Sequence, residues 1–469
     1  MFLRRMVVMS IVLIPIVFLI IVSTFKRLPL IGGNLTVAFA GAGLISLWLG
    51  GAHNPSAWLA PWMKSMDSIA FIFYIVLFGA VFSALQIQSG AMGVVLNILR
   101  ALWGKTPQGL VLATLAALYF GGSLMGTVAA VGAVIGILIV PAMDEMKINQ
   151  DLICAIVVTG ASMGGMMPPV SNAIILACGL VGVDEHEALL ISYATVGIGL
   201  AVIAFFFCKI YIGDKYSLPE HLIPKETAWE IFSKNWVKLI PIFVLITIVM
   251  LNSIPALKFN LPKYLLSMIP YGKATLFAAV AKVPFAGKIV NNIVMAMIFA
   301  IIVNIVLDIG TIKAVGAKLK MQLKAVIEPE VILIATAFFL GAFQLGGQNA
   351  AIAAWAKGLN SSLLIIGGAT ALLIAGMLTG GQSTAQGMLV PILAPAWSTI
   401  GISKMNIALA SAHLSMAGQG FPPCDMNTFI IAGLIGAIIG RPVNPLRSMM
   451  YSAPYCIYLF IVGFIFLVI

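Results

Sequence analysis

Long apolar stretches alternate with short polar segments along the whole of this sequence. A helix needs about 20 apolar residues to cross the hydrocarbon core of a bilayer, and most of the stretches have about that length. The pattern therefore predicts an all-α polytopic membrane protein. The apolar stretches lie at residues 6–24, 33–50, 69–87, 108–142, 151–183, 189–212, 237–253, 289–307, 331–346, 361–400, 404–440 and 451–469.

Two of the longest stretches, 108–142 and 361–400, exceed one crossing but are too short for two ordinary ones. Small residues interrupt the first at Gly121–Thr127 (GGSLMGT) and the second at Gly380–Thr384 (GGQST). Within lipid, non-helical backbone is tolerated only where protein or a wet cavity satisfies its polar groups. We expect both stretches to form re-entrant helical hairpins. The alternative is a pair of short helices joined by a loop at the membrane surface.

A second kind of interruption occurs at Gly164–Asn172 (GGMMPPVSN) and again at Gly418–Asn427 (GQGFPPCDMN). Proline removes a backbone donor and clashes with the preceding turn, and glycine adds conformational freedom, so a helix must break at each place. Two broken transmembrane helices in corresponding positions are typical of a transport site near the membrane midplane.

These interruptions belong to an internal repeat. A displacement of 254 residues aligns Gly122–Gly182 with Gly376–Gly436. The matches fall mainly on glycine and proline, which set backbone shape, so the repeat preserves a fold more than a chemistry. We expect two inverted repeats, each with a hairpin and a Pro-Pro-broken helix. The matched pairs include Gly122/Gly376, Gly126/Gly380, Pro141/Pro395, Gly164/Gly418, Pro168/Pro422, Pro169/Pro423, Gly179/Gly433 and Gly182/Gly436.

The chain divides accordingly into five regions. Gly213–Lys238 is expected to be a loop or a surface-lying amphipathic helix, Lys313–Lys324 a basic loop, and 255–288 a set of surface helices. The regions are scaffold helices at 1–107, a first transport repeat at 108–183, scaffold helices with polar linkers at 184–360, a second transport repeat at 361–440, and a C-terminal transmembrane helix at 441–469.

Composition agrees with a membrane protein, because 61% of the residues are hydrophobic and only 9% are charged, whereas soluble domains have about 25% charged residues. The net charge of +11 comes from basic residues scattered through short loops, as the positive-inside rule requires, and this distribution argues against nucleic-acid binding. The five cysteines show no CxxC spacing and lie in apolar segments, so buried free thiols are expected.

Two cation sites are expected, one at each broken helix with its facing hairpin. A dehydrated Na⁺ ion needs several oxygens, and unwound backbone carbonyls supply them. For any single Ser or Thr beside the break, the alternative is a hydroxyl bonded back to its own helix. No cofactor other than this coupling ion is expected. The residues predicted to bind it are Gly122, Ser123, Gly164, Gly165 and Pro168 in the first repeat, and Gly380, Gly381, Gly418, Gly420, Pro422 and Asp425 in the second.

An anionic substrate is expected where the half-helices begin, because their free N–H groups and positive dipole ends attract carboxylates. No arginine lies within the broken segments, so helix ends must meet the charge or the substrate must carry less of it. The residues predicted to bind substrate are Gly126, Thr127, Ser171, Asn172, Gln382, Ser383, Thr384 and Asn427.

Asp425 stands out among these residues, because it is an acid inside an apolar stretch. An ionisable group at such depth is a functional hypothesis by default: a cation ligand, a proton carrier or a counter-charge. The alternative is a carboxylate that only caps the half-helix starting at Met426. His413 is expected to be a satisfied interior histidine. The acidic cluster at Asp184–Glu187 is expected to be a solvated helix start.

The sequence resembles the large membrane subunit of tripartite ATP-independent periplasmic (TRAP) transporters. The resemblance rests on three kinds of segment, and in each repeat a small-residue turn is followed by a Pro-Pro motif. Val170 and Cys424 stand where the family commonly has serine, and Ser171 and Asp425 follow one place later. The segments are YFGGSLMGTVAAVGAVIGILIVPAM with GASMGGMMPPVSNAIILACG, GGQSTAQGMLVPILAPAW with GISKMNIALASAHLSMAGQGFPPCDMN, and upstream TVAFAGAGLISLWLGG.

The resemblance implies an elevator-type secondary transporter of the bacterial inner membrane. Such a protein imports small organic anions, usually carboxylates, with a sodium gradient. It works with a small membrane subunit and a secreted substrate-binding protein. An alternative within transport is a proton-coupled or binding-protein-independent organic anion transporter of the same superfamily.

Two other classes of membrane protein fit the sequence less well. A membrane enzyme is disfavoured, because the sequence has no HExxH and no intramembrane pair of acids. A channel-like subunit without active transport would not explain why the sequence has two matched broken helices.

Overall fold

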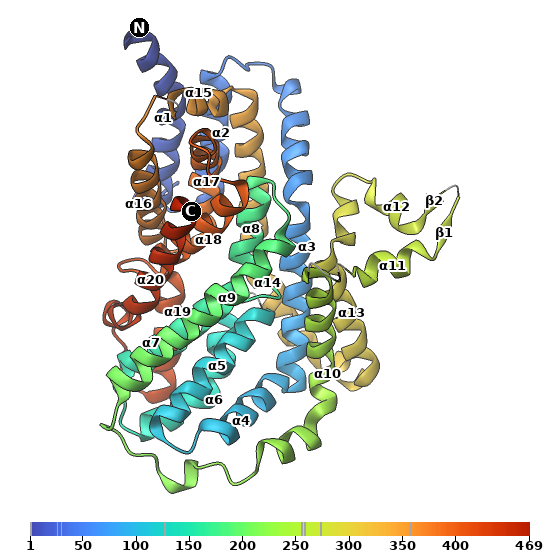
Figure 1. Cartoon of the computed structure of the whole chain (residues 1–469), viewed down its shortest axis with the longest axis vertical. Coiled ribbons are helices and arrows are strands. Elements are labelled where there is room, and N and C mark those ends of the chain that lie inside the picture. The colour runs from blue at the N-terminus through green and yellow to red at the C-terminus, as the bar shows by residue number, and fades with distance from the viewer. Residues whose placement is uncertain are drawn as a thin grey trace.

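The computed structural model describes residues 2–25, 27–29, 31–125, 128–254, 257, 259–272, 274–356 and 358–469, without the side chains of 2–9, 24, 262, 309, 311–313 and 325. Helices make up almost all of this part of the chain (Figure 1). They are α1 (Phe2–Thr24), α2 (Leu35–Leu49), α3 (Leu59–Ser89), α4 (Ala91–Trp103), α5 (Pro107–Met125), α6 (Val128–Glu145), α7 (Gln150–Met166), α8 (Asn172–Val181), α9 (Glu185–Ala204), α10 (Ala228–Ser253), α11 (Leu261–Ser267), α12 (Leu276–Ala281), α13 (Asn292–Leu307), α14 (Ile309–Leu345), α15 (Gln348–Ala356), α16 (Ser361–Thr379), α17 (Gln382–Thr399), α18 (Lys404–Gly420), α19 (Met426–Ile439) and α20 (Pro445–Val468).

Eight helices in the described residues are long and apolar enough to cross a membrane. One of them continues α9 as a π-helix at Phe205–Ile212. Shorter apolar helices, among them α7, α8 and α19, complete the set. The predicted all-α polytopic fold is confirmed. The spans are Pro55–Ser89, Pro107–Met125, Val128–Glu145, Glu185–Ile212, Ala228–Ser253, Ala314–Leu345, Ser361–Thr379 and Pro445–Val468.

The repeat predicted from glycine and proline is visible in the helix boundaries. Helices α5, α6 and α7 begin and end 254 residues before α16, α17 and α18, and α8 begins 254 residues before α19. Each repeat is therefore a helical hairpin (α5–α6 or α16–α17) followed by a broken helix (α7–α8 or α18–α19). The non-helical segments are short, Met167–Ser171 in the first repeat and Phe421–Asp425 in the second.

The repeat extends further into the scaffold than the sequence matches indicated. Helix α1 packs on α2 as α10 packs on α13, and α2 packs on α14 as α13 packs on α3. The short helix α4 contacts α10 in the same way that α15 contacts α1. Apolar side chains vary freely on lipid-facing helices, so the common packing leaves little trace in residue identity.

The two repeats run in opposite directions. The long helices α3 and α14 are equivalent members of the two halves, and they pair along their length (Figure 1). The Trp62 ring near the start of α3 lies 5.4 Å from that of Phe338 near the end of α14. Gly341 likewise lies against the backbone of Pro61. Equivalent helices that are antiparallel define an inverted repeat.

Two polar regions differ from expectation. Lys313–Lys324 is not a loop, because it forms the first part of α14. Lys, Ala, Leu and Gln are good helix formers, and exposed residues alternate there with buried Val315 and Gln322. The described part of 255–288 contains the short helices α11 and α12, as expected. It also contains an antiparallel pair of strands, β1 (Pro270–Tyr271) and β2 (Ala274–Thr275), and it projects sideways from the ends of α10 and α13 (Figure 1).

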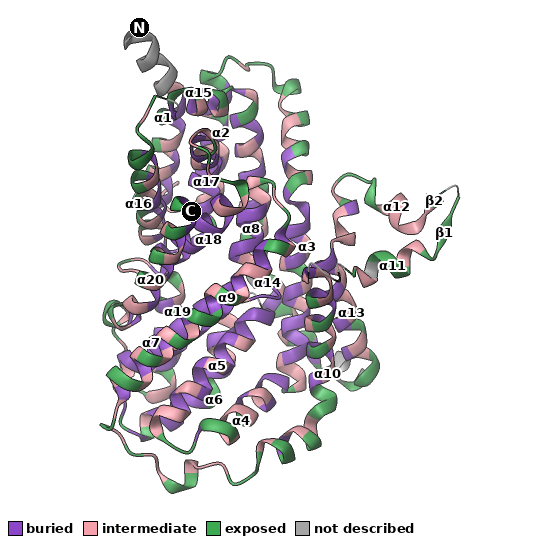
Figure 2. Ribbon diagram, viewed as in Figure 1, coloured by how far each residue is buried: buried purple, intermediate pink, exposed green. Residues whose placement is uncertain are grey.

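The most deeply buried helices are the first arms of the two broken helices. Every residue of α7 from Asp151 to Met166 is buried, as is every residue of α18 from Ile407 to Gly420 (Figure 2). Helix α7 packs on α5 and α20, and α18 packs on α16 and α20. The first break is therefore almost entirely buried, whereas the second is buried at Asp425 and exposed at Pro423.

Candidate substrate and cation site

The turn of each hairpin meets the break of its own repeat. In the first repeat, the N–H of Val170 in the break donates to the Ser123 carbonyl at 3.0 Å. In the second, the N–H of Met426 donates to the Gly380 carbonyl at 3.4 Å. The hairpin turns therefore stand beside the middle of the broken helices. This placement agrees with re-entrant hairpins rather than with loops at a membrane surface.

Glycines allow the hairpin and the broken helix to cross closely. A Cβ atom on Gly122 would lie 2.5 Å from the Gly164 carbonyl carbon, and one on Gly164 would lie 2.5 Å from the Leu118 oxygen. The equivalent glycines, Gly376 and Gly418, face each other in the same way. No side chain fits at these crossings, because backbone atoms occupy the space. The sequence matches Gly122/Gly376 and Gly164/Gly418 thus mark paired backbone contacts.

Ser171 and Asp425 occupy equivalent positions as the N-caps of α8 and α19, and both are fully buried. The Ser171 hydroxyl accepts from the N–H of Ile174 at 3.4 Å. One oxygen of Asp425 accepts from the N–H of Asn427 at 3.1 Å, and the other accepts from the Thr428 hydroxyl. Asp425 therefore caps its helix through both of its carboxylate oxygens.

Most of the glycines predicted to bind the cation lie in the last turns of helices, and Gly380 and Gly381 lie between α16 and α17. The Gly164 carbonyl accepts from the N–H of Met167 at 2.9 Å, and the Gly418 carbonyl accepts from that of Phe421 at 3.2 Å. The Ser123 hydroxyl donates to the Phe120 carbonyl at 2.8 Å. It is therefore bonded back to its own helix, as the alternative for such a hydroxyl predicts. Gly165 and Gly420 are also helical and buried, Gly381 caps α17, and Pro168 and Pro422 are each joined to the next proline by a cis peptide bond.

The residues predicted to bind substrate fall at helix starts. Gln382 and Thr384 are buried in the first turn of α17, whereas Ser383 between them is exposed. Asn172 and Asn427 stand half-buried in the first turns of α8 and α19. Gly126 and Thr127 lie outside the described residues.

Gln386 is a functional candidate that the sequence did not single out. Its side-chain amide donates to Gln382 Oε1 at 2.8 Å, to Ser415 Oγ at 2.9 Å and to the Ala173 carbonyl at 3.2 Å. It therefore joins both elements of the second repeat to the half-helix α8 of the first. The richness of the second repeat in glutamine was the only signal available from the sequence.

Gln419 completes a polar connection at the second hairpin turn. Its Oε1 accepts from the N–H of Gln382 at 2.8 Å, so it caps α17 from the broken helix. Its Nε2 and the Oε1 of Gln386 are buried and make no hydrogen bond in the described part of the chain. Buried polar atoms are seldom left unpaired, so these groups favour a ligand or water at the second break.

A pocket of about 690 Å³ opens beside the second break. Its lining includes Leu378 of α16, Pro423 and Cys424 of the break, and Arg27 from the segment between α1 and α2. Arg27 is exposed and is the cation that this pocket presents among the described residues. It lies almost 400 residues from Pro423 in sequence, so only the fold could bring the two together.

His413 and the cluster at Asp184–Glu187 have structural explanations. Both ring nitrogens of buried His413 have partners, the Leu409 carbonyl at 2.7 Å and the Thr195 hydroxyl at 3.0 Å. Asp184 caps α9 and accepts from the N–H of His186. Although Asp184, Glu185 and His186 stand close together, they form a helix start.

Paired hairpins, broken helices with buried N-caps and an inverted repeat are typical of secondary membrane transporters. The whole chain, residues 1–469, matches the family described as "Tripartite ATP-independent periplasmic transporter, DctM component". The chain belongs to this family, so it is a transporter permease. In such transporters the DctM component is associated with a small membrane subunit and a substrate-binding protein.

The fold is also similar to that in the crystal structure of the Alcanivorax borkumensis YdaH transporter, which is described as having an unusual topology. The TM-score is 0.64, the sequence identity is 15%, and the match covers 92% of this chain and 97% of that one. At this identity the likeness concerns the fold alone. No curated protein sequence gives a significant match.

Proposed function

We propose that this permease imports small organic anions of the carboxylate class, driven by a sodium gradient, through an elevator mechanism. The observation that carries the proposal is the pair of buried N-caps, Ser171 and Asp425, each opposite a hairpin turn. Both lie where backbone polar groups leave the helical pattern deep inside the protein. Such places are where transporters of this design hold ions and substrate.

The second break supplies oxygen donors suited to Na⁺. Asp425 provides a negative charge, and Thr428 provides a hydroxyl already in contact with it. Carbonyl oxygens of Gly380 and Gly418 have one backbone partner each, so each retains a second lone pair. In the first break, Ser171 and the carbonyls of Ser123 and Gly164 form the corresponding set without a formal charge.

The anionic substrate is proposed to bind between the helix starts and Arg27. The N-termini of α8 and α17 present positive dipole ends, which favour a carboxylate. Arg27 adds a guanidinium, which suits a carboxylate because it can donate two parallel hydrogen bonds. The first-turn side chains Asn172, Gln382 and Asn427 would then select among carboxylates by their amide groups.

Reconstituted transport tests the proposal. Proteoliposomes containing the permease, the small membrane subunit and the binding protein should accumulate a carboxylate only with an inward Na⁺ gradient. Equal uptake with K⁺ in place of Na⁺ would contradict sodium coupling. Arg27→Gln should raise the KM for substrate about tenfold, because one charge-assisted contact is lost. Lys282→Gln, which changes an exposed lysine elsewhere, is the matched control.

A proton-coupled or binding-protein-independent transporter is the second candidate. The observation that favours it is Asp425 itself, because a single buried carboxylate is also suited to carry a proton. The two candidates differ in a direct measurement. Uptake driven by an inward pH gradient without Na⁺, or uptake that persists when the binding protein is omitted, would support the second candidate. The inner membrane is the proposed location in both cases, and membrane fractionation checks it.

A further inference from the structure

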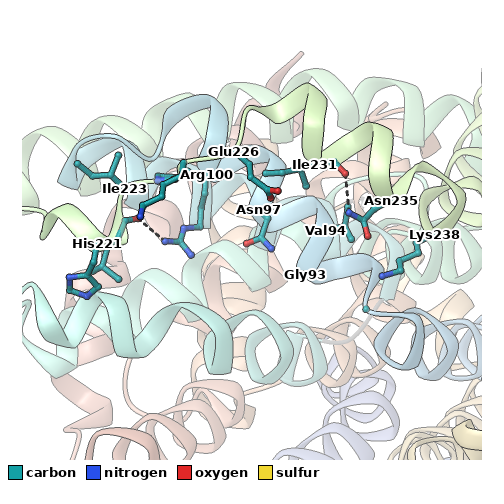
Figure 3. Close-up of a pocket in the computed structure, with 14 residues that line it drawn as sticks. Gly93, Val94, Asn97, Arg100, His221, Ile223, Glu226, Ile231, Asn235 and Lys238 are labelled. Carbon is teal, nitrogen blue, oxygen red and sulfur yellow. Dashed lines mark hydrogen bonds between the residues drawn. The ribbon is translucent and has the colours of Figure 1, made fainter.

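A separate pocket of about 560 Å³ lies between α4, the start of α10 and the linker that joins α9 to α10 (Figure 3). None of its lining residues belongs to either of the two helix breaks. Arg100 of α4, Lys225 of the linker and Lys238 of α10 line it together with the amide side chains of Asn97 and Asn235. Three elements thus bring cationic and amide groups to one cavity.

The charges around this pocket do not cancel. Glu226 is the acidic lining residue, and it forms an ion pair with Lys234 at 2.6 Å. His221 contacts Glu145 at 3.1 Å. Lys225 and Lys238 make no ion pair in the described part of the chain. The pocket therefore retains a net positive charge that an anion would neutralise.

The Arg100 guanidinium is held in place at the wall of the pocket. One of its terminal nitrogens donates to the Leu222 carbonyl at 3.1 Å, which fixes the guanidinium against the linker (Figure 3). Its Nε is buried and makes no hydrogen bond among the described residues. A buried charged donor without a partner is costly, so the site favours an oxygen ligand with negative charge.

The surroundings of the pocket place it at the membrane boundary. Three tryptophans on the same two helices are largely exposed: Trp103 (44%), Trp229 (73%) and Trp236 (50%). Tryptophan is enriched where the apolar core meets the headgroups. Helix α10 begins its candidate span at Ala228, directly after the linker. An apolar surface for acyl chains is present beside them at Leu102 and Val237, which are both exposed.

We propose that this pocket binds the phosphodiester headgroup of an anionic phospholipid, with Arg100, Lys225 and Lys238 as its cationic contacts. Basic pockets between membrane helices are suited to such headgroups. The bound lipid would join α4 to the start of α10. Since α4 leads directly into the first hairpin at Pro107, the headgroup would brace the scaffold where it meets the transport repeat.

Thermal unfolding of the purified full-length chain in detergent tests this site. Phosphatidylglycerol should raise the Tm of the wild-type protein by about 3 °C, because a ligand that binds only the folded state stabilises it. Phosphatidylcholine, which has the phosphodiester but no net charge, should raise it by less than half as much. In Lys225→Gln/Lys238→Gln, at least half of the phosphatidylglycerol effect should be lost. Both lysines are exposed and neither forms an ion pair in the described part of the chain, so the variant should fold.

The control Lys282→Gln/Lys404→Gln removes two exposed lysines elsewhere and should keep the full phosphatidylglycerol effect. An equal loss in both variants would mean general surface attraction and would overturn the site. An unchanged effect in Lys225→Gln/Lys238→Gln would overturn it too. Inorganic phosphate at millimolar concentration is the second arm of the test. If it raises the wild-type Tm as much as the lipid does, the pocket takes free phosphate and the lipid assignment fails.

Discussion

The two breaks share a backbone but differ in charge. Ser171 and Asp425 stand at the same position of the repeat, cap equivalent half-helices and are equally buried. One cap is a neutral hydroxyl, and the other is a carboxylate held by Asn427 and Thr428. Inverted repeats therefore fix where two sites lie without making them alike. The single negative charge places the stronger attraction for a cation in the second half.

The same contrast appears where the repeats contact each other. Gly132 of α6 faces Ile431 of α19, so that a Cβ on the glycine would lie 2.5 Å from the isoleucine. The equivalent position in α17 is Gln386, whose amide donates to Ala173 of α8. One contact between the repeats is apolar and tight, whereas the other is a hydrogen-bonded bridge. The polar contact between the repeats thus comes from the second hairpin, and the apolar one from the first.

The largest loss of stability is expected from changes at the glycine crossings, which both repeats share. Gly164→Ala and Gly418→Ala should each destabilise the protein by more than about 3 kcal/mol, because the new Cβ would overlap backbone atoms of the hairpin. We expect little folded protein by size-exclusion chromatography in detergent. Gly433→Ala is the control, because its Cβ meets nothing within 4 Å. It should fold at least as well as the wild type. Normal folding of both crossing variants would mean that the crossings tolerate a side chain.

Asp425→Asn should lower sodium-driven uptake about a hundredfold, equivalent to about 2.7 kcal/mol, because it removes the charge that distinguishes the second site. Asparagine caps helices as well as aspartate does, so the unfolding temperature should stay close to that of the wild type. Uptake measured against Na⁺ concentration separates the two effects. Wild-type uptake in this variant would reduce Asp425 to a helix cap.

The sequence predicts the breaks well because glycine and proline act through the backbone alone. Pro168–Pro169 and Pro422–Pro423 specify non-helical segments wherever they occur, and the glycine matches specify close approach. Gln386 and Arg27 escape such reasoning, because their importance comes from partners distant in sequence. The charge of its lysines predicts a loop at the first part of α14, although lysine also favours helix. Local rules thus predict the frame, and tertiary contacts decide which polar side chains meet.

Gln386→Ala tests the second contrast and should cost about 1–2 kcal/mol of stability, because Ser415 and Gln382 lose a partner in a buried place. Thermal unfolding in detergent measures the loss. The matched variant is Gln108→Ala on α5, whose amide contacts Gly213 and Asp214 at the partly exposed surface. Loss of this exposed contact should cost less, because water replaces the hydrogen bonds. An equal loss of stability in the two variants would show that the buried hydrogen bonds of Gln386 stabilise the protein no more than exposed ones do.

Ser171→Ala should have the smallest effect, and it measures what a neutral cap contributes on its own. The Ile174 N–H loses its acceptor, and loss of an N-cap hydroxyl typically costs about 1 kcal/mol. If the first site binds its ion mainly through carbonyls such as those of Ser123 and Gly164, uptake should fall only about threefold. Ser171→Asn restores a capping side chain and should recover the stability without adding charge. A loss of uptake as large as that of Asp425→Asn would instead mean that both sites depend on the side chain at the cap, and the charge difference between the halves would not govern coupling.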